Sequence, residues 1–256
     1  PARWPSRPAS SRMRSLIALW RLTRLTLHVL HGLLLVRLQF GRLDAAGRHA
    51  RIGWWSRKCL RLLGVQLQLR GSGRKGAKLI VANHVSWLDI AAIHAVLPEA
   101  RFVSKADVRH WPLVGVLVEG AGTLFIERAS KRDALRVVHQ SAEALKAGDT
   151  VAVFPEGTTG AGPELLPFHA NLLQAAIATE APIQPLVLRW HAPGERFSVA
   201  ARFIGDMTLA QSLWAIASAR GLGMDIQILP AEQTAHADRR ALAEHMRTQI
   251  AQALEA

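Results

Sequence analysis

Apolar and polar positions along the chain follow two patterns, which divide it near residue 64. Residues 13–40 and 43–63 predict two helices, and Gly41 and Gly47 mark the break between them. Residues 65–70 alternate apolar and polar positions, which predicts a strand. Beyond residue 78, short apolar runs alternate with helical stretches. We expect strands at 79–82, 101–104, 123–126, 150–154, 183–190, 197–203 and 224–229, and helices at 87–97, 112–120, 131–146, 167–179, 210–220 and 238–255.

Nearly continuous apolar strands separated by helices are typical of an α/β fold. We therefore predict a mixed, largely parallel sheet that is covered by helices on both faces. Residues 1–64 would form an N-terminal two-helix hairpin, and residues 65–256 the α/β domain. No linker composition separates the two parts, so we expect the hairpin to dock on the domain. Active sites of open α/β sheets lie beyond the carboxyl ends of strands, where candidate chemistry is therefore sought.

The charge of the chain is concentrated in its first third. Residues 1–78 hold 17 Lys and Arg and a single acid, a net charge of +16, whereas residues 79–256 carry −3. Such asymmetry indicates a polyanionic partner, either nucleic acid or an anionic membrane. With 50% apolar and 20% charged residues the chain is not a disordered segment, and its single cysteine, Cys59, excludes a disulfide-stapled module.

An uncharged run of 12 residues, 25–36, favours the membrane. A helix that crosses a bilayer needs about 20 apolar residues, so this run suits a helix that lies in the membrane interface. Indole rings and arginines are favoured at the headgroups. The side chains expected there are Trp20, Arg21, Arg24 and Arg37.

Other interpretations of the first segment carry less weight. It would also suit a hairpin that only packs on the domain, or a mitochondrial-type leader, because residues 1–14 contain Arg and Ser and no acid. Nucleic acid is not expected as a partner, because no strand alternates aromatic and basic residues.

His84 and Asp89 follow the expected strand at 79–82. They do not share one face of a helix, but they meet if His84 ends the strand and Asp89 lies in the first turns of the next helix. Asp89 would then accept a ring N–H and stabilise the imidazolium, and His84 would act as general base for a hydroxyl. Taken alone, the pair is equally compatible with a capping or buried structural histidine.

Two further motifs follow strands. Gly122-Thr123-Leu124-Phe125-Ile126-Glu127-Arg128 ends in an arginine, which binds phosphate bidentately, unless it merely pairs with Glu127. Phe154-Pro155-Glu156-Gly157-Thr158 combines a rigid exit, a glycine and hydroxyl and N–H donors. Glu156 would hold a substrate hydroxyl or an active-site arginine, and the alternative is a plain turn.

The three motifs together, in this order, resemble the glycerolipid acyltransferase family of the 1-acyl-glycerol-3-phosphate acyltransferase type. Residues 181–187 look like that family's proline-flanked strand, and the resemblance covers about residues 50–230. It implies an α/β domain and, in bacterial members, a two-helix N-terminal membrane anchor. It therefore implies that residues 1–64 associate with the membrane and that residues 65–256 form the acyltransferase domain.

The resemblance also implies roles for individual residues. His84 would be the catalytic base and Asp89 its orienting partner. The acceptor would be bound by Lys105, Gly122, Arg128, Glu156, Gly157 and Thr158. The expected enzyme moves an acyl chain from acyl-CoA or acyl-carrier protein to the free hydroxyl of a lysolipid, 1-acyl-sn-glycerol-3-phosphate, giving phosphatidic acid. We expect no cofactor and no metal, and a location at the cytoplasmic face of the bacterial inner membrane.

Some positions depart from the family pattern. Thr159 and Gly160 stand where members often have Arg and Ser, and His169 stands where they often have Lys. Phosphate recognition would then depend on Arg128 and Lys105, which leaves a lyso-ornithine lipid or another lysolipid as alternative acceptor. A second alternative is a non-catalytic membrane-surface protein that binds lipid.

Overall fold

The computed structural model describes residues 11–126 and 131–256, apart from the side chains of residues 105, 126 and 131–134. Its centre is a seven-stranded sheet of order β1-β7-β6-β2-β5-β3-β4. The strands are β1 (Gln66–Arg70), β2 (Lys78–Ala82), β3 (Ala100–Lys105), β4 (Leu124–Ile126), β5 (Thr150–Val153), β6 (Ile183–His191) and β7 (Gly223–Ile228). β6, β2, β5, β3 and β4 are parallel, and β7 and β1 run the opposite way. The predicted mixed, largely parallel sheet is confirmed.

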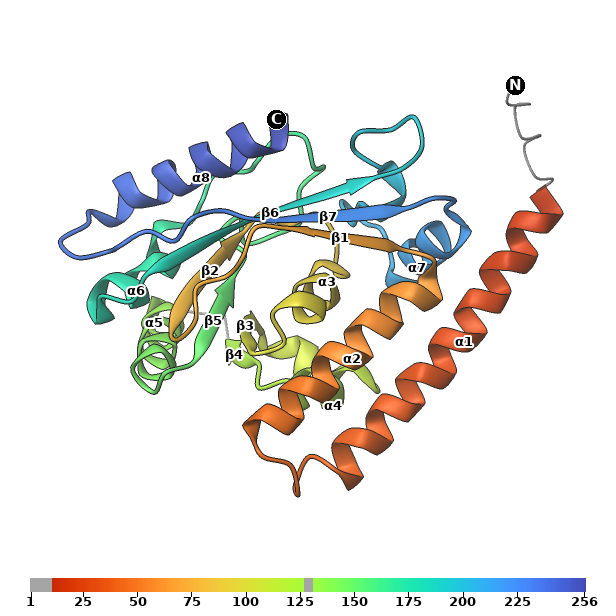
Figure 1. Cartoon of the computed structure of the whole chain (residues 1–256), viewed down its shortest axis with the longest axis horizontal. Coiled ribbons are helices and arrows are strands. Elements are labelled where there is room, and N and C mark those ends of the chain that lie inside the picture. The colour runs from red at the N-terminus through yellow and green to blue at the C-terminus, as the bar shows by residue number, and fades with distance from the viewer. Residues whose placement is uncertain (1–10, 127–130) are drawn as a thin grey trace.

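Helices cover both faces of the sheet (Figure 1). On one side lie α1 (Ser11–Leu38), α2 (Ala45–Leu63), α3 (Asp89–Val96), α4 (Val114–Gly120) and α7 (Leu209–Ser218), and on the other α5 (Lys131–Lys146), α6 (Gln174–Thr179) and α8 (Arg239–Glu255). Two hydrophobic cores result, since alternate residues of β2 enter opposite ones: Ile80 packs with α2 and α3, and Val81 with α6 and α8. Fully buried strands of this kind explain the unbroken apolar runs.

The expected strand at 197–203 was wrong. The Ser198 hydroxyl accepts from the Ala200 N–H and starts a short 3-10 helix, η3 (Val199–Ala201), in which Val199 is 58% exposed. A short apolar run does not distinguish a buried strand from such a turn when a serine competes for the backbone N–H. The expected helix at 167–179 is divided into η2 (Ala170–Leu173) and α6. The remaining 3-10 helix, η1 (Ala106–His110), joins β3 to α4.

The N-terminal hairpin is held together by a reciprocal pair of contacts. The Trp55 indole N–H donates to the His28 carbonyl at 3.1 Å, and His28 Nε2 lies 2.9 Å from the Trp55 carbonyl. Their rings stack 4.9 Å apart. A Cβ on Gly32 would lie 2.5 Å from the Trp55 ring nitrogen, so only glycine permits this approach. α2 packs on α3 and α1 on α7, so the hairpin docks on the sheet domain. The division at residue 64 stays a prediction.

Arg21 does not face outward as expected. Its guanidinium donates to the carbonyls of Ala217 and Ala219 at the end of α7, at 2.9 and 2.8 Å, and burial lowers its pKa. Arg21 therefore ties α1 to α7, where the last carbonyls of a helix need donors. Trp20, Arg24 and Arg37, the other three residues expected at a membrane, are exposed. Among the described residues, no helix is both long enough and apolar enough to cross a membrane.

Candidate active site

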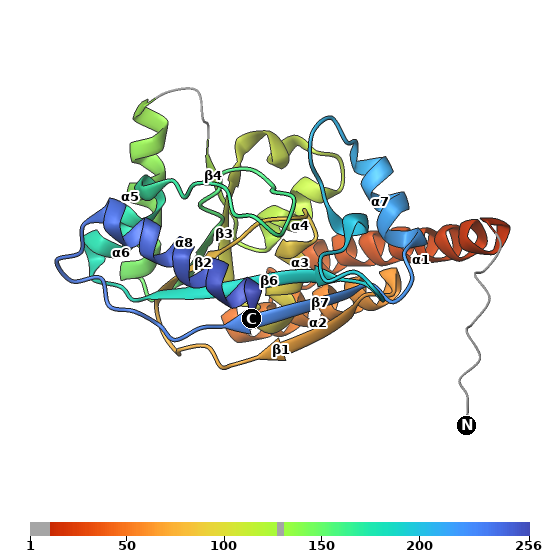
Figure 2. The same ribbon diagram turned by 90° about the horizontal axis from the view of Figure 1, so that it is seen from above.

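The carboxyl ends of β2, β5, β3 and β4 lie side by side, because these parallel strands are neighbours in the sheet. His84 follows β2, Glu156 follows β5, and Lys105 is the last residue of β3. Figure 2 shows which elements surround this edge. In the upper half of the view, toward which β4 ends, lie the segment after β5, η1 with α4, and α7. The topology therefore brings these three motif positions to one edge.

His84 and Asp89 form a hydrogen-bonded pair at this edge. His84 Nδ1 lies 2.9 Å from Asp89 Oδ2, and Asp89 opens α3. Because a carboxylate only accepts, Nδ1 carries the proton and Nε2 keeps its lone pair. Within the described residues no group hydrogen-bonds Nε2, and the His84 side chain is 16% exposed. The pair therefore has the geometry of an oriented general base.

Asp89 is fully buried and accepts four hydrogen bonds from the described residues. Oδ2 takes the His84 ring N–H and the backbone N–H groups of Val85 and Ser86, at 2.7 and 2.9 Å. Oδ1 takes the indole N–H of Trp190, in β6, at 2.6 Å. A buried carboxylate needs such partners, since each unsatisfied polar group is costly. Asp89 is thus compensated and immobile.

The segment after β5, residues 154–160, hydrogen-bonds both the N–H and the carbonyl of His84. The His84 N–H donates to Glu156 Oε1 at 2.7 Å, and the His84 carbonyl accepts from the Gly160 N–H at 2.7 Å. Phe154 stacks on the imidazole, with ring centroids 3.9 Å apart and 8° between the planes. These contacts leave the ring few alternatives to the orientation that faces Asp89.

Glu156 has other partners than those expected. Its second oxygen accepts from the Leu166 N–H at 2.9 Å, so both oxygens bind backbone groups. Burial raises its pKa, and the two backbone hydrogen bonds oppose that shift. Glu156 was expected to hold a substrate hydroxyl or an arginine. In the structure its carboxylate instead accepts hydrogen bonds from the backbone N–H groups of His84 and Leu166. The difference arises because the loop folds back so that residue 166 reaches the carboxylate.

Gly157 turns the chain at the mouth of the site. Its φ of 71° is in the left-handed region, and a Cβ there would lie 3.0 Å from the His169 ring. The requirement for glycine at this position is therefore steric. Thr158 and His169 are exposed beside this turn, whereas the Thr159 hydroxyl donates to the Phe203 carbonyl.

Gly122 does not join the group. It lies in the turn before β4, at the amino end of the strand, where its carbonyl accepts from Arg101 at 2.9 Å. Its φ of 75° fits a turn glycine, so its identity is explained by backbone conformation rather than by acceptor contact. Arg128 and the side chain of Lys105 lie outside the described residues, so their expected contact with the acceptor stays a prediction.

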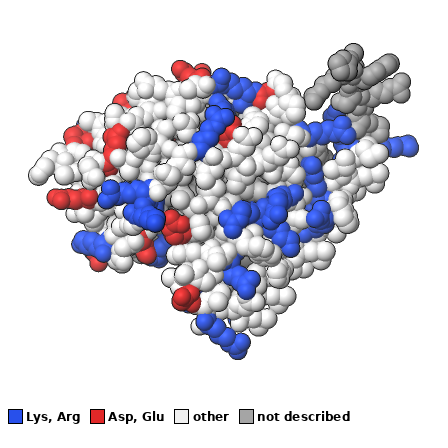
Figure 3. Space-filling model, viewed as in Figure 1, with Lys and Arg blue, Asp and Glu red and all other residues white. Residues whose placement is uncertain are grey.

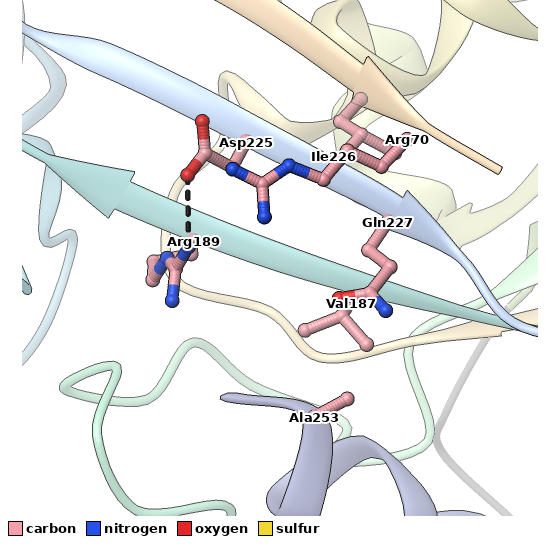
Figure 4. Close-up of a pocket in the computed structure, with 7 residues that line it drawn as sticks. All are labelled: Arg70, Val187, Arg189, Asp225, Ile226, Gln227 and Ala253. Atoms are coloured by element: carbon pink, nitrogen blue, oxygen red, sulfur yellow. Dashed lines mark hydrogen bonds and ion pairs between the residues drawn. The ribbon is translucent and has the colours of Figure 1, made fainter. Parts of the chain in front are cut away.

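A small pocket on another part of the sheet carries no residue of these motifs (Figure 4). It has a volume of about 10 Å³. It is bordered by Arg70, Val187, Arg189, Asp225, Ile226, Gln227 and Ala253. Arg189 donates to Asp225 at 3.0 Å, so two of the three charged side chains there form an ion pair within the sheet.

The sequence gives no role to Asn83 or Trp190, yet hydrogen bonds of both side chains join the 83–89 segment to β6. The Asn83 amide donates to the Leu188 carbonyl at 2.9 Å and accepts from its N–H at 2.8 Å. β6 extends beyond the end of β2, because Ala82 is paired with Leu186 and β6 continues to His191. An apolar run at 183–190 longer than its neighbours was the available signal, but the order of strands in the sheet is needed to interpret it.

Comparisons with known proteins agree with this geometry. The family model described as Acyltransferase matches residues 66–189. The lyso-ornithine lipid O-acyltransferase of Pseudomonas aeruginosa is 36% identical over 201 residues, which cover 78% of this chain and 77% of that protein. The 1-acyl-sn-glycerol-3-phosphate acyltransferase of Neisseria gonorrhoeae is 37% identical over 163 residues, 63% of each chain.

A solved structure shows the same fold. The crystal structure of the 1-acyl-sn-glycerophosphate acyltransferase PlsC from Thermotoga maritima matches with a TM-score of 0.71 at 19% identity, covering 95% of both chains. The family expected from the motifs is confirmed by the 36% identity to the Pseudomonas aeruginosa relative, which extends over more than two thirds of both chains. The strand-end His84–Asp89 pair, the matched domain and the extent of the shared sequence lead to one conclusion: the chain belongs to the acyltransferase family.

Proposed function

We propose that this acyltransferase moves an acyl chain from a thioester, acyl-CoA or acyl-carrier protein, to the free hydroxyl of a lysolipid. The acceptor we favour is 1-acyl-sn-glycerol-3-phosphate, with phosphatidic acid as the product. The observation that carries the proposal is the His84–Asp89 pair, with Nε2 of His84 free of described partners at the edge where the strand-end motifs meet.

The reaction needs one base and one proton return. His84 Nε2 takes the proton of the acceptor hydroxyl as its oxygen attacks the thioester carbonyl carbon. The carbonyl π electrons move to the oxygen, and Asp89 stabilises the imidazolium that has formed. When the tetrahedral intermediate collapses, the C–S bond breaks and the thiolate takes the proton from His84. The products are an ester and a free thiol, and the enzyme returns to its starting state.

A phosphate on the acceptor would be bound by Arg128, and Lys105 would supply a second positive charge. A guanidinium after β4 would lie at the same edge as His84, because β4 is parallel to β3. Its charge would be suited to the headgroup dianion, because residues 79–256 carry a net charge of −3 and do not attract an anion by their overall charge.

A lyso-ornithine lipid is the second candidate acceptor. It is favoured by the Pseudomonas aeruginosa relative, a lyso-ornithine lipid O-acyltransferase, whose match covers more of this chain than that of the Neisseria gonorrhoeae protein. Thr159 also supports it, since this residue replaces a frequent arginine of the family and its hydroxyl turns inward to Phe203.

The bilayer would be met by α1. Eight large apolar side chains of this helix are between 44% and 64% exposed: Met13, Leu16, Leu19, Trp20, Leu27, Leu30, Leu34 and Leu38. All but Met13 recur on the side opposite the buried residues. Figure 3 shows Lys and Arg side chains gathered over α2 and α1. An apolar stripe beside these cations suits the interface of an anionic membrane, and we propose the cytoplasmic face of the bacterial inner membrane.

The segment from η1 into α4 would extend this surface toward the active site. Trp111, Leu113 and Val116 are 42%, 48% and 38% exposed. α4 packs on α1, and this segment follows β3, at the edge that carries His84. A bilayer that touches both elements would lie against the mouth of the site, where two lipid substrates arrive.

The test is product identification with a panel of acceptors. Purified protein receives acyl-CoA and, in separate vesicle samples, lysophosphatidate or lyso-ornithine lipid, and the products are identified by mass spectrometry. We expect phosphatidic acid from lysophosphatidate and at least tenfold loss in Arg128→Ala, in line with a charge-assisted bond to phosphate. Equal rates in Arg128→Ala would remove the phosphate assignment, and acylation of lyso-ornithine lipid alone would replace the acceptor. No product with either acceptor would favour the non-catalytic lipid-binding alternative.

A further inference from the structure

We propose that Trp190 is a positioning residue for the His84–Asp89 pair. This inference rests on the proposed function, in which His84 is the base. Trp190 is 2% exposed, and its indole N–H donates to Asp89 Oδ1 at 2.6 Å. It lies 101 positions away in the sequence and belongs to none of the three motifs.

The two oxygens of Asp89 have different hydrogen-bond donors. Oδ2 receives the ring N–H of His84 and two backbone N–H groups of the same loop. Among the described residues, Oδ1 receives only the indole N–H of Trp190. Loss of that bond would let the carboxylate rotate about its Cβ–Cγ bond and would draw Oδ2 away from the imidazole.

Trp190 connects the His84–Asp89 pair to the rigid sheet. Its backbone is paired with Met224 of β7 on one side, and its N–H···O partner lies on α3. The other contacts of the pair come from the 84–86 loop and the segment after β5, which are not strands. Trp190 is therefore the link between the catalytic carboxylate and the β-ladder.

The test compares Trp190→Phe with a matched control, Trp87→Phe. Trp87 also donates its indole N–H to a buried partner, the Ser212 hydroxyl at 3.0 Å, and among the described hydrogen bonds none joins its indole to Asp89. Both changes keep an aromatic ring, remove the same volume and remove one donor. We expect kcat in Trp190→Phe to fall about tenfold with KM within a factor of two, because a misoriented carboxylate slows the proton transfer and leaves acceptor binding unchanged. Trp87→Phe should change neither, and equal behaviour of the two variants would overturn the proposal.

A second measurement does not depend on the stability or activity of Trp190→Phe. The indole N–H resonances of Trp190 and Trp87 are followed by NMR in the wild type and in Asp89→Asn. We expect the Trp190 resonance to move upfield and that of Trp87 to stay in place. An unmoved Trp190 resonance would show that the contact is not made. If the contact is present and the wild type acylates no lysolipid, the proposed function fails and the link between the side chains stands.

Discussion

His84 is held at four points, one on α3 and three in the segment that follows β5. Asp89 fixes the ring from α3, Phe154 stacks on it from the end of β5, and Glu156 and Gly160 hold its backbone. The cost of ordering these groups is borne by folding rather than by substrate binding, which is how preorganised sites gain rate.

Glu156 is the restraint that a single conservative change tests best. In Glu156→Gln one oxygen becomes an amide NH2, so either the His84 N–H or the Leu166 N–H loses its acceptor. We expect kcat to fall at least tenfold, and the free energy of unfolding to fall by about 1–3 kcal/mol, as for other unsatisfied buried donors. Thiol release and urea unfolding measure the two effects. Glu164→Gln, an exposed carboxylate of the same loop, is the control. Full activity in Glu156→Gln would mean that His84 does not need this support.

His94 gives the fold a dependence on pH that is separate from catalysis. It is buried in α3, its Nε2 lies 2.9 Å from the Ala100 carbonyl, and burial lowers its pKa from 6.5 to about 4. Since the unfolded chain takes up this proton near pH 6.5 and the folded chain only near pH 4, the free energy of unfolding should fall as the pH drops between these values. The loss is about 3 kcal/mol.

Denaturant titrations of His94→Leu between pH 4 and 7 check this expectation. The variant should lose the part of the slope that is due to His94, and His139→Leu, which removes an exposed histidine, should retain it. The comparison of the slopes is independent of other groups that titrate in the same range. A slope that is the same in the wild type and in His94→Leu would contradict the assignment.

At the scale of elements, α1 is apolar on two opposite faces. One face packs on α2, α4 and α7, and the other carries the exposed leucines. Both faces are apolar, so the helix does not show the usual division into an apolar and a polar side. An exposed apolar face along a whole helix indicates a binding partner, because extended apolar patches are uncommon on the surfaces of monomeric soluble proteins.

Charges placed on the exposed face of α1 test its role. We expect Leu27→Glu combined with Leu34→Glu to weaken binding to phosphatidylglycerol vesicles about a hundredfold, because two leucines leave the interface and two anions enter it. Vesicle co-sedimentation measures this effect. Leu135→Glu on α5, where the leucine is 71% exposed, is the matched control and should bind as the wild type does. Equal binding of the α1 variant would show that this face does not contact the membrane.

For the whole molecule, the sequence predicts most of the architecture. Helices and strands are revealed by period and length, since both faces of the sheet are buried and its strands are apolar throughout. The run at 197–203 misled because exposure of Val199 and the turn at Ser198 depend on tertiary context. The order of the strands is not encoded in local periodicity, so the position of β6 beside β2 had to come from the structure.

The same limit applies to the site. His84 and Asp89 are close in sequence, and their pairing follows from a strand that leads into a helix. The partner of Asp89 from β6 and the fold-back of residue 166 onto Glu156 are contacts between distant segments, which no spacing indicates. The expectation that Arg21 faces outward was wrong for the same reason. Its hydrogen-bond partners lie at the end of α7, far away in the sequence.

The central claim is that His84 deprotonates a lysolipid hydroxyl for attack on an acyl thioester. The most direct test is the rate of thiol release from acyl-CoA by wild type and His84→Ala, with and without lysophosphatidate in vesicles. We predict release that requires the acceptor in the wild type, and a fall of about a hundredfold or more in His84→Ala, with the fold retained by circular dichroism. Acceptor-dependent thiol release by His84→Ala at the wild-type rate would contradict the account.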